Sequence, residues 1–104
     1  MNADMQKINA KLEVLKKAYS QKIKSHIEDL KTFLAEGFQP EDIYSIIHSI
    51  SGTSGMFGMS EVSALATDFE FFLKELKNKP KGTDQNILNE KLEKFIRDLE
   101  LLGL

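Results

Sequence analysis

Hydrophobic and polar residues follow a helical period along almost the whole chain, and no segment shows the two-residue period of a strand. In the first third, apolar residues follow one another at steps of three or four, which places them on one face of a helix. They are Ile8, Leu12, Leu15, Tyr19, Ile23, Ile27, Leu30 and Leu34. This pattern predicts a helix from about Asp4, its N-cap, to Glu36, with Gly37 ending it.

The length of this first helix is unusual for a small domain. Each helical residue adds ~1.5 Å, so an unbroken helix would be about 50 Å long, more than a small bundle needs. We therefore expect one of two arrangements. Either the first turns extend beyond the body of the domain, or the chain divides near Ala18, Tyr19 and Ser20 and the first turns fold back as a separate short helix.

Three further helices are predicted. The second begins at Pro40, because proline suits the first helical position, and it ends near Gly58. Ser60 is the expected N-cap of the third helix. A basic loop separates the third helix from the last one, which is capped by Thr83 or Asp84.

The expected buried faces of these helices are again sets of apolar or small residues at helical spacing. In the second helix they are Ile43, Ile46, Ile47, Ile50, Ser54 and Phe57. In the third they are Val62, Leu65, Ala66, Phe69, Phe72, Leu73 and Leu76, and in the last Leu88, Leu92, Phe95, Leu99 and Leu102. Four amphipathic helices with short links predict an all-α fold, an antiparallel up-down four-helix bundle, with residues 1–104 as one domain.

Composition then narrows the function classes. A chain of 104 residues can bury roughly 60–70% of the surface of its unfolded form, which suffices for one core. The balance of 14 basic and 16 acidic residues argues against general nucleic-acid binding. The absence of cysteine excludes disulfides and thiolate metal sites and favours a reducing compartment. With no apolar stretch near the ~18 residues of a membrane span and a polar N-terminus, we expect a cytoplasmic protein without membrane insertion.

The second helix contains an exception to its own pattern. Projection at ~100° per residue places His48 about 150° from the mean direction of the apolar stripe, on the outer face. Gly52 and Gly55 project within about 40° of His48. Each glycine inside a helix costs about 0.8–1 kcal/mol relative to alanine, so two of them beside an exposed imidazole need an explanation.

The residues alone leave two explanations open. Glycine removes side-chain bulk, and Ser45, Ser49 and Ser51 are also small, so another macromolecule could approach an imidazole that reacts or is recognised. Alternatively, the glycines mark a fraying helix end and His48 is an ordinary surface residue.

The segment from His48 to Gly58 resembles the signature of histidine-containing phosphotransfer (HPt) domains. That signature has a histidine followed by an apolar residue two positions on, lysine three on, glycine four on, a small residue six on, an apolar residue nine on and glycine ten on. This sequence supplies Ile50, Gly52, Ser54, Phe57 and Gly58 at those positions. The family usually has Glu or Gln 22 positions after the histidine, where Glu70 stands. The resemblance covers about 8–102 and is strongest over 43–76.

The resemblance implies a function in phosphorelay. The Nε2 atom of His48 would accept a phosphoryl group from an aspartyl phosphate of a receiver domain, or return it. Glu70 would bind the other ring nitrogen and orient the imidazole, with an ordinary solvated glutamate as the alternative. The receiver would supply Mg²⁺, so the chain needs no cofactor and no metal ligands of its own. The implied partners are a response-regulator receiver domain, a histidine kinase or both, and the chain would be a carrier without turnover, not an enzyme.

One position departs from the family pattern. Ser51 stands where the family usually has a lysine that is thought to hold the phosphoryl group near the imidazole. This departure puts the retention and the rate of transfer in doubt, but not the location of the site. Lys74 is the only Lys or Arg between Gly37 and Leu76, so the sequence offers no obvious substitute nearby.

The residues around His48 would form the partner-binding surface. They are Tyr44, Ser45, Ser51, Gly52 and Gly55. For Tyr44, packing at the rim of the bundle is the alternative. Phe71 projects opposite the buried face of its helix and is either a partner or dimer contact or packs under the first helix. His26 lies beside the first apolar stripe and is expected to be a boundary residue without chemistry.

A different class of function competes with the carrier, namely a helical module that binds a receiver or dimerises through its first helix without phosphorylation. For the carrier itself a monomer is expected. A metal-dependent bundle enzyme is disfavoured, because the chain has neither Glu-x-x-His nor paired inward carboxylates. The apolar end, from Leu101 to Leu104, favours an N-terminal module of a longer signalling protein.

Overall fold

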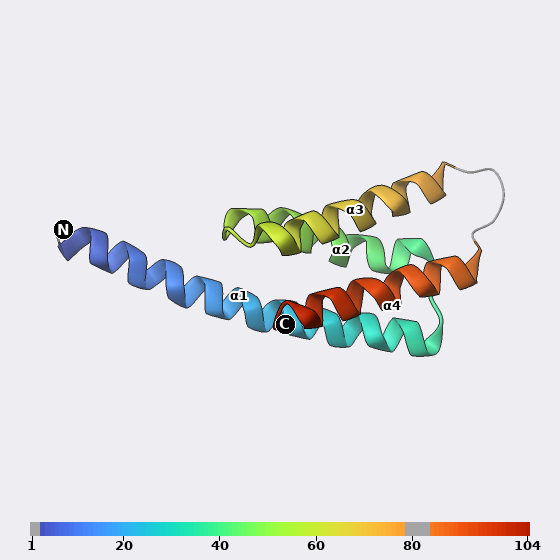
Figure 1. Ribbon diagram of the computed structural model, residues 1–104, viewed down its shortest axis with the longest axis horizontal. Coiled ribbons are helices and arrows are strands. Elements are labelled where there is room, and N and C mark those ends of the chain that lie inside the picture. Colours follow the sequence, from blue (N-terminus) through green and yellow to red (C-terminus); the bar gives the residue numbers. More distant parts are fainter. Residues whose placement is uncertain (1–2, 79–83) are drawn as a thin grey trace.

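The protein is an all-α, up-down bundle of four helices, as the sequence predicts (Figure 1). A computed structural model describes residues 3–78 and 84–104, with side chains from Lys7 onward. The helices are α1 (Ala3–Glu36), α2 (Pro40–Met56), α3 (Ser60–Lys77) and α4 (Gln85–Leu101), and each runs antiparallel to the one before it. Within the described residues there is no strand, and none of these helices is long and apolar enough to cross a membrane.

Local signals account for most helix boundaries. Pro40 opens α2, and the Asp42 carboxylate accepts a hydrogen bond of 2.7 Å from the backbone N–H of Gln39. Asp84 is the N-cap of α4, because its carboxylate accepts from the N–H groups of Asn86 and Ile87 at 2.9 and 3.4 Å. Thr83 and most of the predicted basic loop lie outside the described residues.

The start of α3 differs from the prediction by one residue. The N-cap is Met59 and Ser60 is already helical, so the predicted Ser60 cap is wrong. The reason lies in the preceding turn, where the N–H of Met59 donates to the carbonyl of Ser54 at 2.9 Å. Gly58 between them has φ +72°, the left-handed conformation that glycine adopts at low cost. This tight turn commits the chain to the third helix before Ser60.

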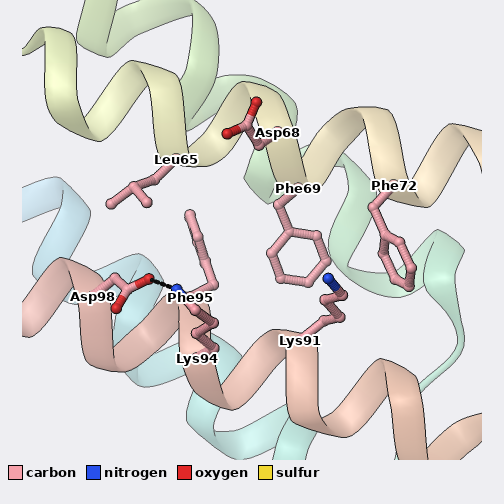
Figure 2. A pocket seen from close by; sticks show the side chains of 8 residues that line it. All are labelled: Leu65, Asp68, Phe69, Phe72, Lys91, Lys94, Phe95 and Asp98. Atoms are coloured by element: carbon pink, nitrogen blue, oxygen red, sulfur yellow. Dashed lines mark hydrogen bonds and ion pairs between the residues drawn. The ribbon is translucent and has the colours of Figure 1, made fainter.

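The core consists of the inward faces of all four helices. Its fully buried large residues are Ile23, Leu30, Ile43, Ile47, Ile50, Leu88, Leu92 and Leu99. Phe69 of α3 and Phe95 of α4 meet edge to face, with ring centroids 5.2 Å apart (Figure 2). Ile96 is buried although the pattern does not predict it, because α4 packs against both α1 and α3 and buries a wider face. Leu102 is exposed, contrary to the prediction, because α4 ends at Leu101.

The first helix is unbroken over 34 residues and extends past the body of the bundle (Figure 1). Of the two expected arrangements, the extension is the observed one. Tyr19 is the first buried residue of α1, and its ring lies 5.3 Å from that of Phe57 at the end of α2. Ile8, Leu12 and Leu15 are therefore 54%, 44% and 51% exposed, although they continue the buried stripe. The N-terminal part of α1 extends past the ends of the other helices (Figure 1).

Tyr19 also forms a polar link to α2. Its hydroxyl donates to the carbonyl of Ile50 at 3.3 Å and lies 3.1 Å from the hydroxyl of Ser54. Ser54 is the one buried polar residue among the described side chains, and it is fully buried. A buried hydroxyl needs such a partner, because leaving it unpaired is costly. The second half of α2 is thus fixed to α1 by specific bonds as well as by apolar packing.

We predict that Tyr19→Phe lowers the free energy of unfolding by about 1–3 kcal/mol, because the buried Ser54 hydroxyl loses its partner. Urea unfolding followed by circular dichroism measures this loss. In the double variant Tyr19→Phe/Ser54→Ala, both polar partners are gone, so its destabilisation should be smaller than the sum of the two single effects. Additive effects would contradict the proposed bond.

Candidate functional site

His48 lies on the outer face of α2, as its projection predicts, and its side chain is 66% exposed. Its Nδ1 atom is 2.7 Å from Oε1 of Glu70 on α3, across a separation of 22 residues. A carboxylate can only accept a hydrogen bond, so Nδ1 is the donor and carries the hydrogen. When the ring is neutral, the lone pair is then on Nε2, which has no hydrogen-bond partner among the described residues.

Glu70 is only 12% exposed and has a partner on each oxygen. Its second oxygen, Oε2, lies 3.3 Å from Nζ of Lys74, one helical turn further along α3. Burial opposes ionisation of Glu70, but the hydrogen bonds from His48 and Lys74 outweigh it and lower the pKa of this carboxyl. The hydrogen bond to Glu70, together with nearby Tyr44, raises the pKa of Lys74. Both partners of this ion pair therefore remain charged near neutral pH.

Tyr44 is half-buried one turn before His48. Its ring is parallel to the imidazole within 8°, and the ring centroids are 5.9 Å apart. This contact, together with the bond to Glu70, restricts rotation of the imidazole. Of the two roles that the sequence left open for Tyr44, packing at the rim of the bundle is present, since the side chain packs against the core cluster as well as on His48.

Ser51 occupies the other side of His48 and is bound to α3. Its hydroxyl lies 2.7 Å from that of Thr67, and its carbonyl accepts a hydrogen bond of 3.0 Å from the hydroxyl of Ser63. A pair of neutral hydroxyls thus occupies the place where the family pattern has a cation. Sequence reasoning did not identify Ser63 and Thr67. Extending the His48–Glu70 register along two antiparallel helices would have found them.

The two glycines of α2 have different surroundings. A Cβ atom added to Gly52 would have no neighbour within 4 Å, so the surface is open there. A Cβ atom on Gly55 would lie 3.5 Å from the hydroxyl of Ser63, an ordinary contact with α3. α2 continues to Met56, so Gly52 lies one turn before the end of the helix, whereas Gly55 lies in its last turn. Ser45 is exposed on the same helix.

Two hollows lie near these helices. One, of about 310 Å³, adjoins the site and is lined by Pro40, Glu41, Tyr44, Leu73, Lys74 and Lys77. The other, of about 180 Å³, lies between α3 and α4 and is lined by none of the predicted site residues (Figure 2). In it Lys91 lies over the Phe72 ring, 5.3 Å from the centroid, and Lys94 pairs with Asp98 at 2.6 Å. These lysines already have partners.

The remaining candidates lie outside the His48 site. Phe71 is exposed on α3, so the alternative that it packs under the first helix is wrong. His26 is half-buried on α1, which fits a boundary position, and its Nε2 atom has no partner in the described part of the chain. Burial, with the nearby charge of Lys22, lowers the pKa of His26, against a smaller opposing effect of Asp29. Over the described side chains, no three potential metal ligands gather in one place.

Comparison with known proteins identifies the family of this chain. The family model of the Hpt domain matches residues 14–101, which include all four helices and leave out only the first turns of α1 and the last residues. Comparisons with curated proteins and with solved structures gave no match. Because this family model covers most of the chain and its bundle, the chain belongs to the Hpt domain family, whose members are phosphocarrier modules of two-component signalling.

Proposed function

We propose that this domain is a phosphorelay carrier that accepts a phosphoryl group on Nε2 of His48 and exchanges it with an aspartate of a receiver domain. The observation that carries the proposal is the 2.7 Å contact between Nδ1 of His48 and the Glu70 carboxylate, on an imidazole that is 66% exposed. The contact assigns the hydrogen to Nδ1 and leaves Nε2 available as the nucleophile.

The transfer step follows from this arrangement. The Nε2 lone pair attacks phosphorus, and an N–P bond forms as the bond between phosphorus and the aspartyl oxygen breaks. The electron pair of the broken bond stays on the aspartate carboxylate. His48 retains its Nδ1 hydrogen, and the positive charge that develops on the ring is stabilised by Glu70. The reverse step returns the phosphoryl group, so the carrier is neither consumed nor turned over on its own.

Phosphoryl transfer needs positioning and charge neutralisation more than covalent assistance. In the proposal, the receiver supplies Mg²⁺, while this chain supplies the nucleophile and its orientation. A histidine kinase could be the alternative donor. The partner-binding surface comprises Tyr44, Ser45, Ser51, Gly52 and Gly55, with the open surface at Gly52 allowing close approach of the partner's backbone. We place the domain, as a monomer, in the cytoplasm with these partners.

A binding module without phosphorylation is the second candidate. It is favoured by the apolar residues Ile8, Leu12 and Leu15, which are exposed on the extension of α1 and offer a contact surface separate from His48. The two candidates differ in whether His48 takes up phosphate.

His48→Gln should abolish phosphoryl uptake. Glutamine keeps a polar side chain but has no nucleophilic nitrogen, and His48 is exposed, so folding should be unaffected. The measurement is acid-labile phosphate after incubation with a phosphorylated receiver or a histidine kinase. His26→Gln is the matched control, because the chain has 2 histidines, and this variant should retain uptake. Acid-labile phosphate on the His48→Gln variant would disprove the assignment.

Gly52 provides a test of the docking surface. Gly52→Ala should stabilise the domain by up to about 1 kcal/mol, because the position is helical and an added Cβ meets nothing. Gly52→Leu should leave the fold intact and slow phosphoryl transfer by steric exclusion of the partner. Transfer rates from stopped reactions measure the effect, with Ser25→Leu at an exposed position of α1 for comparison. Unchanged transfer in a folded Gly52→Leu variant would show that the partner docks elsewhere.

Glu70 should control the tautomer of His48. In the wild-type domain the neutral imidazole should carry its hydrogen on Nδ1, and Glu70→Ala should remove this preference. Nitrogen-15 NMR of the two ring nitrogens distinguishes the tautomers, and the signals of His26 provide the internal control. The same tautomer populations in both proteins would remove Glu70 from the mechanism.

A further inference from the structure

The charge around His48 poses a problem for a phosphoryl carrier. Between Gly37 and Leu76 the chain has six acidic residues and a single basic one, Lys74. A phosphoryl group on Nε2 would add negative charge close to the Glu70 carboxylate. Ser51 provides no positive charge, and its hydroxyl and carbonyl are already bonded to Thr67 and Ser63. A compensating charge has to come from elsewhere.

Lys74 is placed to provide that charge from the facing helix. Its Nζ atom is 3.3 Å from Oε2 of Glu70, while Oε1 of the same carboxylate binds His48 at 2.7 Å. Lys74 lies i+4 from Glu70, so helix geometry holds the two side chains side by side. Tyr44 and Lys74 line the same hollow, and Tyr44 is stacked on His48. His48 thus contacts both Glu70 and Tyr44, and Lys74 is joined to His48 through Glu70.

We infer that Lys74 is a positioning and charge-neutralising residue of this site, which supplies from α3 the positive charge that position 51 lacks in α2. The inference rests on the proposed function. Lys74 fixes Oε2 of Glu70, so Oε1 stays aimed at Nδ1 of His48 and Nε2 remains the free nitrogen. The Glu70–Lys74 pair carries no net charge, so Glu70 can accept the hydrogen bond from Nδ1 while Lys74 offsets the repulsion between the carboxylate and the phosphoryl group. The sequence offered no obvious substitute for the lysine that the family has at position 51. The antiparallel pairing of α2 with α3 brings Lys74 close enough to act as one.

The effect should be modest and sensitive to salt, because Lys74 is exposed. Lys74→Gln should shift the exchange equilibrium with a phosphorylated receiver away from phosphorylated His48 by about 1.4- to 5-fold at low ionic strength, the range for exposed ion pairs. The shift should shrink as salt rises. Lys74→Arg should preserve the wild-type equilibrium, because arginine keeps the charge within reach of Glu70.

Lys77→Gln is the matched control. Lys77 is an exposed lysine near the end of α3 and lines the same hollow, but no ion pair joins it to Glu70 within the described residues. Lys77→Gln removes the same charge as Lys74→Gln but breaks no ion pair with Glu70. The shift of the exchange equilibrium in Lys77→Gln should therefore be clearly smaller. The double variant Lys74→Gln/Ser51→Lys tests directly whether Lys74 replaces a cation at position 51. A lysine at position 51 should restore the wild-type exchange equilibrium that Lys74→Gln shifts. Equal shifts in Lys74→Gln and Lys77→Gln, or no shift in either, would overturn the inference.

A phosphate-free measurement separates this inference from the proposed function. Nitrogen-15 NMR of His48 should show a weaker Nδ1–H preference in Lys74→Gln than in the wild type or Lys77→Gln, because Glu70 is no longer held on its second oxygen. Unchanged tautomers in Lys74→Gln would overturn the positioning role. If the wild-type domain takes up no phosphate from any donor, the proposed function fails and the charge-neutralising role fails with it. The NMR result still decides the positioning role.

Discussion

The antiparallel pairing of α2 with α3 is the constraint on which the site depends. The turn between them is closed by two backbone bonds, from Gly58 to the carbonyl of Gly55 and from Met59 to that of Ser54, at 3.2 and 2.9 Å. Its left-handed residue is Gly58, with φ +72°. Because this turn is short and fixed, the register of the two helices is fixed as well. The side-chain pairs Ser51–Thr67 and His48–Glu70 join residues placed symmetrically about the turn.

That register produces a row of polar contacts on the outer face of the pair. Starting from the turn, Gly55 meets Ser63, Ser51 meets Thr67, His48 meets Glu70, and Tyr44 lies near Lys74. The row changes from neutral hydroxyls near the turn to an ion pair further away. The imidazole stands where the two kinds of contact meet, and it is held on one nitrogen only. A histidine held in this way has the orientation that a nucleophile needs and the exposure that a partner needs.

The first helix, α1, stabilises the position of α2. Tyr19 bonds to Ile50 and to the buried Ser54, and both lie in the half of α2 that follows His48. Glycine lowers the stability of a helix, and Gly52 and Gly55 both lie in that half of α2. This loss is offset by packing and by specific hydrogen bonds. On the N-terminal side of Tyr19, the large apolar side chains that the structure describes in α1 are exposed. The matched family region begins at Val14, so most of this extension lies outside the match.

The sequence by itself determined the four helices, most of the core and the outward direction of His48. These features follow from local periodicity and caps, which are recorded in neighbouring residues. The pairing of His48 with Glu70 was implied by the family resemblance, and the structure shows the contact. Only the tertiary structure decided that Ile8, Leu12 and Leu15 are exposed, that Ile96 is buried, and that Ser51 is bonded to Thr67.

The role of Lys74 shows the difference most clearly. In the sequence it is an isolated lysine 26 positions from His48, whereas in the fold it shares the Glu70 carboxylate with the imidazole. Periodicity states which way a side chain points from its own helix, but not where the neighbouring helices end or which of their side chains stand opposite. Burial and charge compensation depend on those neighbours, and their positions are set by the packing of the whole bundle.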